Sequence, residues 1–448
     1  MNPVLSPNTQ WASLRRSCHS GKMPDPPSFS KSMIINQRSI IVIKEAGFPP
    51  TVAFSPFQPY RSRMQEFDRE FPRRGTGSLK WDRRPDLDPL WVADMDFQSP
   101  AEVIFALQDR VKHGIFGYAL PHQGLIETLQ NYLEKRMAYS AAEEEIVHLG
   151  GLVPALSLAA RAFGDPGDAL LTCTPIYPPF LGINKDASME VIKVPHAKTS
   201  GLVTTWTFDW DAMEDAVTER TKLFLLSNPQ NPLGRSFTAG EITRLAEFCE
   251  KYDLILVSDE IHCDLILDEQ ATPHFSALNL PESLRRRSIT LLAPSKTYNI
   301  AGLGYAFAVI PDPSIRRRFN AVKGHTLAEI NCLAYYAAEA AYRHGEEWRQ
   351  DLLTYLARNR DILTSTLRRD LPGVDVPRIE ATYLAWIDLR ACDIEDPIGK
   401  AEKAGLFLSD GAFFGSPGCL RINFGTQTDR LKNALAQLIP ALSSSGSA

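Results

Sequence analysis

The stretch Leu291-Leu-Ala-Pro-Ser-Lys296-Thr-Tyr-Asn-Ile-Ala-Gly-Leu303 decides the fold of this chain. The apolar run Ile289–Leu292 predicts a buried strand, and a lysine follows it among small and hydroxyl residues. Lysine is rarely buried without a reason, and desolvation lowers the pKa of its amine, so that the amine can attack an aldehyde as a Schiff-base lysine does. Taken alone, a lysine after a strand is more often a surface residue than a Schiff-base lysine. The surrounding sequence therefore has to distinguish the two interpretations.

Polar side chains follow two other apolar runs in the same way. Leu254-Ile-Leu-Val-Ser-Asp259-Glu-Ile-His262 places an acid at the carboxyl end of a predicted strand, where open α/β sheets gather ligand groups. A carboxylate there can keep a pyridine nitrogen protonated, and the alternative is a helix N-cap. Ser227-Asn-Pro-Gln-Asn231-Pro-Leu-Gly-Arg235 also follows a strand, although an Asn-Pro-rich segment by itself is usually a turn.

Apolar runs and helical patterns alternate through the middle of the chain. Because the runs lack internal alternation, they favour a mostly parallel sheet covered by helices on both faces. The expected strands are Ala169–Cys173, Lys222–Leu226, Leu254–Val257, Ile289–Leu292 and Tyr305–Ile310, and the expected helices include Ala101–His113, Leu125–Arg136, Leu152–Phe163 and Ala239–Lys251. After Glu329, helices to Tyr342 and over Glu346–Arg369 precede two alternating strands, Tyr383–Leu389 and Cys419–Phe424, which predict a smaller α+β unit. The fold class is therefore α/β with a second, smaller α+β domain.

The 448 residues exceed one ordinary hydrophobic core, so we predict several segments. They are an extension (1–63), an N-terminal arm with part of the small domain (64–112), a large domain (113–333), a C-terminal small domain (334–442) and a tail (443–448). The extension carries eight lysines and arginines, two acidic residues and nine prolines. It can be a disordered basic tail, an organellar transit peptide or upstream sequence with Met64 as the true start, and we favour an extension or a misplaced start over targeting.

Composition narrows the function classes. An apolar fraction of 44% with 23% charged residues is typical of a soluble globular protein, and a net charge of -5 argues against nucleic acid as a partner. No run of about 18 apolar residues exists, so we expect no membrane partner. Seven scattered cysteines without a CxxC pair suggest reduced thiols and a cytoplasmic location, and we predict no metal site.

Asn-Pro-x-Asn-Pro-x-Gly, Asp-x-x-His and Ser-Lys-Thr-Tyr-Asn, in this order, resemble the motifs of fold-type I pyridoxal-phosphate enzymes, the class I/II aminotransferases. The resemblance covers roughly residues 66–440 and implies an aspartate-aminotransferase-like fold with pyridoxal 5′-phosphate as cofactor. It implies that Lys296 is the Schiff-base lysine and the base that moves the Cα proton, and that Asp259 pairs with the pyridine nitrogen. Asn231 and His262, where many relatives have tyrosine, are expected at the ring's 3-oxygen, and Tyr177 is expected to stack on the ring.

The resemblance also implies which residues bind the two anionic groups, the cofactor phosphate and the substrate α-carboxylate. Gly151, Leu152 and Val153 would present backbone N–H groups to the phosphate at a helix start, where Gly150-Gly151 could otherwise be an ordinary loop. Arg421 would bind the substrate α-carboxylate, with Asn231 beside it, although an arginine on an alternating strand is usually a solvated residue. Many aminotransferases have a phosphate-binding serine and arginine where this chain has Ala293 and Gly304, so Ser295, backbone amides or other groups must replace them.

A narrower resemblance indicates the reaction. Lys80-Trp-Asp, Leu90-Trp-Val-Ala-Asp-Met-Asp-Phe97 and His113-Gly-Ile-Phe-Gly-Tyr118 look like the cystathionine β-lyase and cysteine-S-conjugate β-lyase branch that is related to the bacterial MalY and PatB proteins. In this branch the tyrosine matching Tyr118 reaches the cofactor phosphate of the neighbouring subunit, which implies a homodimer with shared active sites.

We therefore predict a C–S β-lyase that cleaves cystathionine or a cysteine S-conjugate to a thiol, pyruvate and ammonia, with Lys296, Asp259 and Tyr118 as catalytic residues. The alternative is an aminotransferase that needs a 2-oxo acid acceptor, because fold alone does not settle the reaction. A non-enzymatic protein is a third interpretation, and the retention of Lys296, Asp259, Asn231 and Arg421 speaks against it.

Overall fold

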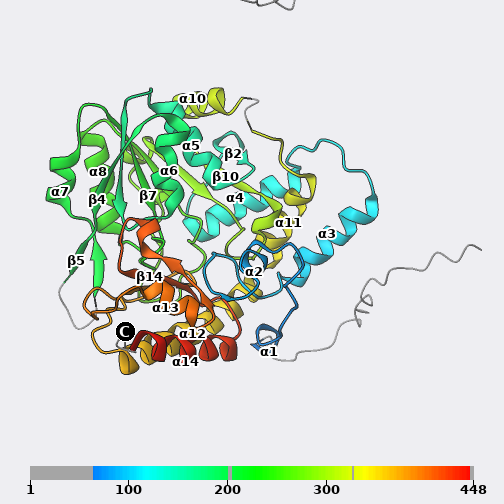
Figure 1. Ribbon diagram of the computed structural model, residues 1–448. Helices are drawn as coiled ribbons and strands as arrows, with labels where there is room; N and C mark the ends of the chain where they lie inside the picture. Colours follow the sequence, from blue (N-terminus) through cyan, green and yellow to red (C-terminus); the bar gives the residue numbers. More distant parts are fainter. Residues whose placement is uncertain (1–63, 200–203, 325–326, 444–448) are drawn as a thin grey trace, which may run out of the picture. The chain divides into compact units, whose positions relative to one another are not determined.

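A seven-stranded sheet lies at the centre of the computed structural model, which describes residues 64–199, 204–324 and 327–443 (Figure 1). The strand order is β2-β10-β9-β8-β7-β3-β4, and all neighbours run parallel except β10, which is antiparallel to both β2 and β9. The strands are β2 (Ile146–Leu149), β3 (Ala169–Thr174), β4 (Glu190–Pro195), β7 (Thr221–Ser227), β8 (Ile255–Asp259), β9 (Ser288–Leu292) and β10 (Ala306–Val309).

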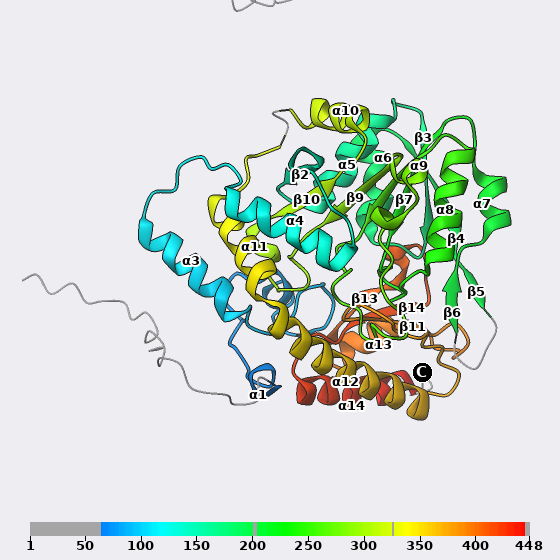
Figure 2. The same ribbon diagram turned by 180° about the vertical axis from the view of Figure 1, so that it is seen from behind.

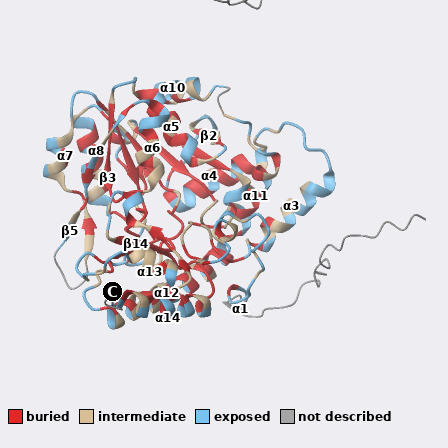
Figure 3. Ribbon diagram, in the orientation of Figure 1, coloured by how far each residue is buried: buried red, intermediate tan, exposed pale blue. Residues whose placement is uncertain are grey.

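Helices cover both faces of this sheet, which explains why its inner strands are apolar without alternation (Figures 1 and 2). One face packs against α5 (Leu152–Phe163), α6 (Pro178–Ala187) and α10 (Pro313–Lys323). The other face packs against α8 (Ala239–Lys251) over β3 and β7, and against α4 (Gln123–Met137) and α11 (Cys332–His344) over β9 and β10. Colouring by burial shows the sheet as the buried layer, with exposed residues on the outer sides of the helices (Figure 3).

A second, antiparallel sheet of three strands is built mainly from the C-terminal part of the chain. Its order is β11 (Leu384–Asp388), β14 (Cys419–Asn423) and β13 (Ser409–Asp410). It shares one hydrophobic cluster with α12 (Glu346–Asp370), α13 (Pro397–Lys403) and α14 (Thr428–Ser443). Helices α12 and α14 lie side by side in both views (Figures 1 and 2).

Residues 64–113 pack against the second sheet and against a helix that covers the central sheet. Phe67, Leu90, Met95 and Phe97 are buried in the cluster of the second sheet, and α3 packs against α11. The remaining elements are α1 (Met64–Phe67), α2 (Leu79–Asp82), α3 (Ala101–His113), α7 (Trp210–Ala216), α9 (Glu282–Arg285), the parallel pair β1 (Asp88–Pro89) and β12 (Leu406–Phe407), the hairpin β5 (Ala197–Thr199) and β6 (Thr205–Thr207), and the 3₁₀ turns η1 (Glu143–Glu145), η2 (Ala277–Asn279), η3 (Ala301–Leu303) and η4 (Gly411–Phe414).

The predicted α/β class with a mostly parallel central sheet is confirmed. The predicted domain boundaries stay predictions, and the predicted extension 1–63 lies outside the described residues. None of the helices that the structure describes is both long and apolar enough to cross a membrane.

Phe307 and Phe413 provide a matched test of the core. Phe307 is fully buried on β10, whereas Phe413 in η4 is 70% exposed. We expect Phe307→Ala to lower the free energy of unfolding by about 3–5 kcal/mol, because it leaves a cavity, and Phe413→Ala to change it by less than about 0.5 kcal/mol. Urea unfolding measures both values. Equal losses in the two variants would contradict this assignment of the core.

Candidate active site

Three neighbouring strands end at one cavity. Ser227 and Asp259 are the last residues of β7 and β8, and Lys296 follows β9 by four residues. The cavity measures about 230 Å³ and is lined by Ala93, Gly150, Gly151, Leu152, Val153, Pro154, Tyr177, Ser227, Asn231, Asp259, Ile261, His262, Ala293, Ser295, Lys296, Ala301, Gly304 and Tyr305. Parallel strands place their carboxyl ends at the same edge of a sheet, which is where open α/β sheets bind ligands.

Lys296 lies in the wall of this cavity, and its Nζ donates a hydrogen bond to the backbone oxygen of Ala93 at 2.6 Å. Loss of solvation lowers the pKa of the ammonium to about 8, against the opposing effect of the Asp94 carboxylate. A lysine with this pKa presents an appreciable fraction of free amine near neutral pH, which a nucleophile or a base requires.

Asp259 ends β8 with its side chain buried. Burial raises the pKa of this carboxyl to about 7, and the neighbouring Glu260 acts in the same direction. The backbone N–H of Ile261 donates to Asp259 Oδ1 at 3.1 Å and opposes that rise. A buried carboxyl with a raised pKa gains most from a cationic ring nitrogen, because such a partner favours its ionised form.

His262 is almost completely buried in the cavity wall, and its Nδ1 has no hydrogen-bond partner among the described residues. Burial and the nearby Lys296 lower the pKa of the imidazole to about 3, so the ring stays neutral in the working range of an enzyme. A neutral imidazole can donate from one nitrogen and accept at the other, so His262 can hydrogen-bond to a ligand oxygen.

Arg421 on β14 joins the second sheet to the site. Its Nη1 donates to Asn231 Oδ1 at 3.0 Å, and its Nη2 donates to the backbone oxygen of Trp91 at 2.7 Å. Its Nε is buried without a hydrogen-bond partner among the described residues. Burial lowers the pKa of the guanidinium to about 10. Because Arg421 donates only to neutral acceptors and its Nε has no partner among the described residues, its guanidinium can bind a carboxylate.

The amino-terminal end of α5 forms another wall of the cavity. Gly151 caps the helix, and Leu152 and Val153 are its first residues, so their N–H groups have no partner within the helix. Ala293 and Gly304 both line the cavity, and Gly304 has φ +65° with a backbone oxygen, that of Gly150, only 3.3 Å from where a Cβ would lie. A larger side chain at position 304 would therefore be strained. The groups at this wall that could bind an anion are Ser295 and the free backbone amides at the start of α5.

The structure brings all but two of the predicted site residues into the cavity lining. Tyr177 lines it from the cap of α6, and Arg421 reaches it through Asn231. Tyr118 is outside the lining and completely exposed, in the loop between α3 and α4. In the single chain, Tyr118 is therefore not part of the site.

The sequence did not predict two residues near Lys296, namely Ala93, which contacts the lysine, and Tyr383, which contacts Ala93. Ala93 acts through its backbone oxygen, which carries no signal in side-chain type. Tyr383 donates its hydroxyl hydrogen to the same oxygen at 3.1 Å, from a position just before β11. Tyr383 begins the expected strand Tyr383–Leu389, but its place there gave no indication of this contact.

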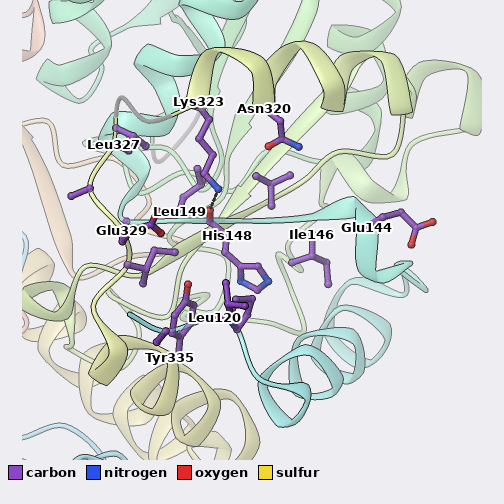
Figure 4. Close-up of a pocket in the computed structure, with 17 residues that line it drawn as sticks. Leu120, Glu144, Ile146, His148, Leu149, Asn320, Lys323, Leu327, Glu329 and Tyr335 are labelled. Atoms are coloured by element: carbon purple, nitrogen blue, oxygen red, sulfur yellow. Dashed lines mark hydrogen bonds between the residues drawn. The ribbon is translucent and has the colours of Figure 1, made fainter. Parts of the chain in front are cut away.

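A larger cavity of about 420 Å³ lies along β2 and the end of α10 (Figure 4). It shares Gly150 with the first cavity, and His148 in its lining is 2.9 Å from the hydroxyl of Tyr305, which lines the first cavity. None of the predicted site residues lines it. Among the described residues, no group of His, Cys, Asp and Glu side chains could hold a metal ion.

Comparison with known proteins gives one consistent result. The family model "Aminotransferase class I and II" matches residues 89–438. Cystathionine β-lyase PatB of Bacillus subtilis (strain 168) is 34% identical, and the match covers 84% of this chain and 100% of that protein. The solved structure of OvoB is 39% identical with a TM-score of 0.81 and covers 85% of this chain and 100% of that chain. The pyridoxal-phosphate-bound C–S lyase of Staphylococcus hominis is 30% identical with a TM-score of 0.78, covering 84% and 98%.

Asp259 makes the stability of the cofactor-free protein depend on pH. The unfolded chain ionises this carboxyl near pH 4, whereas the folded chain keeps it protonated up to about pH 7, so stability falls as the pH rises through this window. Asp259→Asn removes that loss. We expect the variant to gain on the order of 2 kcal/mol relative to the native chain between about pH 5 and pH 8, measured by urea unfolding. Parallel pH dependences in the two proteins would refute the proposed state of Asp259.

Proposed function

The chain belongs to the class I and II aminotransferase family, and from that premise we propose that it is a pyridoxal-phosphate-dependent C–S β-lyase. It would cleave cystathionine or a cysteine S-conjugate to a thiol, pyruvate and ammonia. The observation that carries the proposal is the convergence of Lys296, Asp259 and Asn231 in one cavity, with Arg421 bound to Asn231. Relatives named as cystathionine β-lyase and C–S lyase match over nearly their whole length.

Pyridoxal 5′-phosphate is the cofactor, and the residues of the cavity fit it. The buried Nδ1 of His262 lacks a partner among the described residues, as a site for a ligand oxygen requires. A Cβ placed on Gly150 would meet no atom within 4 Å, so this wall leaves room for a bulky group. Lys296 would hold the aldehyde carbon, Asp259 the ring nitrogen, Asn231 and His262 the 3-oxygen, and the start of α5 with Ser295 the phosphate.

Each of the chain's own residues then has a separate task. Arg421 binds the substrate α-carboxylate through its free Nε, and Asn231 fixes the guanidinium. Tyr177 covers one face of the cavity from the start of α6. Lys296 takes the proton from the substrate's Cα, and the bound cofactor supplies the ring that delocalises the remaining electron pair.

The reaction is completed when the Cβ–S bond breaks. The sulfur leaves with the electron pair of that bond and takes up a proton as a thiol, and water converts the three-carbon fragment to pyruvate and ammonia. Lys296, which lines the cavity and is protonated in the previous step, can return that proton.

A direct assay tests the reaction. Purified, cofactor-loaded protein is supplied with cystathionine or S-alkyl cysteines and no oxo acid, and pyruvate and thiol are quantified. We expect equal amounts of both, and a loss of at least about 10³-fold in Lys296→Ala because the base is gone. The exposed Lys185→Ala variant should retain full activity. Turnover only after addition of a 2-oxo acid, without pyruvate release, would establish the aminotransferase alternative instead.

We further propose a homodimer with shared active sites. The loop between α3 and α4 exposes four large apolar side chains, Ile115 (66%), Phe116 (57%), Tyr118 (100%) and Leu120 (84%). Such a concentration of exposed apolar surface is typical of a protein contact. Tyr118 would reach the phosphate end of the partner's cavity. A cytoplasmic location stays a prediction from the scattered cysteines.

Subunit mixing tests this arrangement. Tyr118→Ala and Lys296→Ala, each of low activity alone, are unfolded together and refolded. If Tyr118 serves the other subunit, each mixed dimer has one intact site, and activity should return to about a quarter of the native value. If Tyr118 serves its own chain, every site in the mixture lacks one residue, and no activity returns.

A further inference from the structure

One backbone oxygen receives both the catalytic lysine and a buried tyrosine. The oxygen of Ala93 accepts from Lys296 Nζ at 2.6 Å and from the Tyr383 hydroxyl at 3.1 Å. Burial raises the pKa of Tyr383 beyond its usual range, so its hydroxyl remains a donor. The Lys296 amine and the Tyr383 hydroxyl thus share one backbone acceptor.

The peptide around Ala93 is held firmly. Asn423 on β14 donates from its Nδ2 to the backbone oxygens of Val92 and Asp94, both at 2.6 Å. The fully buried Lys80 donates to the oxygen of Asp94 at 3.1 Å. An acceptor fixed in this way needs no rearrangement when its donor arrives.

The carboxylate of Asp94 adds a charge beside this acceptor. Its Oδ2 accepts from Arg73 Nη2 at 3.0 Å, and Lys80 Nζ lies 3.6 Å from its Oδ1. That buried Oδ1 has no hydrogen-bond partner among the described residues. Of the charges that act on Lys296, Asp94 has the largest effect, ahead of Arg421 and Asp259.

Other polar groups also face Lys296. The charged and titratable groups around it are Asp94 beside the acceptor, Asp259 at the end of β8, His262 after it, Tyr383 before β11 and Arg421 on β14. Arg421 disfavours the ammonium, whereas the two carboxylates favour it. Asp259 would be engaged by the cofactor ring, which leaves Asp94 as the carboxylate for the released lysine.

We propose that Ala93 and Asp94 form the resting place of the free Lys296 amine, in which the Ala93 oxygen orients the amine and the Asp94 carboxylate stabilises it once it has taken up the substrate proton. Asp94 is thus a positioning residue for proton transfer. The proposal rests on the role of Lys296 in the proposed function. It is tested on the lysine itself, so its failure is distinguishable from failure of the lyase reaction.

The test measures the protonation of Lys296 in the full-length, cofactor-free protein. Trace acetic anhydride labels free amines across a range of pH, and mass spectrometry quantifies the peptide that contains Lys296. Asp94→Asn removes a stabilising charge from the ammonium, so we expect the labelling midpoint to fall by about 0.5–1 pH unit. Asp88→Asn is the matched control, because Asp88 is also a partly exposed carboxylate paired with arginine but is not among the charges acting on Lys296.

A second measurement uses the loaded enzyme. In Asp94→Asn the acid limb of the pH profile of kcat should move in the same direction, because the base is then harder to protonate in the substrate complex. Urea unfolding establishes that both variants are folded. An unchanged labelling midpoint in folded Asp94→Asn, or an equal shift in Asp88→Asn, would overturn the proposal.

Discussion

The removal of Lys296 from water is the constraint on which the rest of the site depends. An ammonium loses solvation on burial, and this loss brings its pKa down to about 8. The chain limits the cost with one fixed acceptor, the Ala93 oxygen, and with the carboxylates of Asp94 and Asp259. These groups come from different parts of the fold, since Asp259 ends a strand of the central sheet while Asn423 of the second sheet holds the peptide around Ala93. The Lys296 amine therefore has these neighbours only when both sheets are folded.

Two other buried groups of the site, Arg421 and Asp259, form no salt bridge among the described residues, and a ligand could supply the oppositely charged partner. Arg421 is a buried cation whose hydrogen bonds within the described residues go to neutral oxygens, and Asp259 is a buried acid with a raised pKa. A buried group without an oppositely charged partner destabilises the ligand-free protein. Binding of a carboxylate to Arg421 and of a protonated ring to Asp259 would remove this cost. At the end of the cavity proposed for the phosphate, Ala293 and Gly304 carry no charge, and the start of α5 offers backbone N–H groups.

The sequence predicted those features that side-chain type or periodicity determines. Helices Leu152–Phe163 and Ala239–Lys251 have the expected bounds, because their apolar faces repeat at helical spacing. The direction of β10 was not predicted, since an apolar run reads the same in a parallel or an antiparallel strand. Lys296, Asp259, Asn231 and Arg421 were found through their motifs, whereas the part played by Ala93 depends on a backbone oxygen that only the tertiary structure brings to the lysine. Tyr118 lies outside the cavity of its own chain, and its expected contact with a second chain stays a prediction.

The most direct test of this account asks which lysine holds the cofactor. The loaded protein is reduced with borohydride, digested and analysed by mass spectrometry for a phosphopyridoxyl group. The account predicts this group on Lys296 alone, and its absence in Lys296→Ala, since Lys296 is the lysine that lines the cavity formed at the ends of β7, β8 and β9. Labelling of another lysine, such as Lys323 in the cavity along β2, would show that the cofactor binds elsewhere and would contradict the assignment of the site.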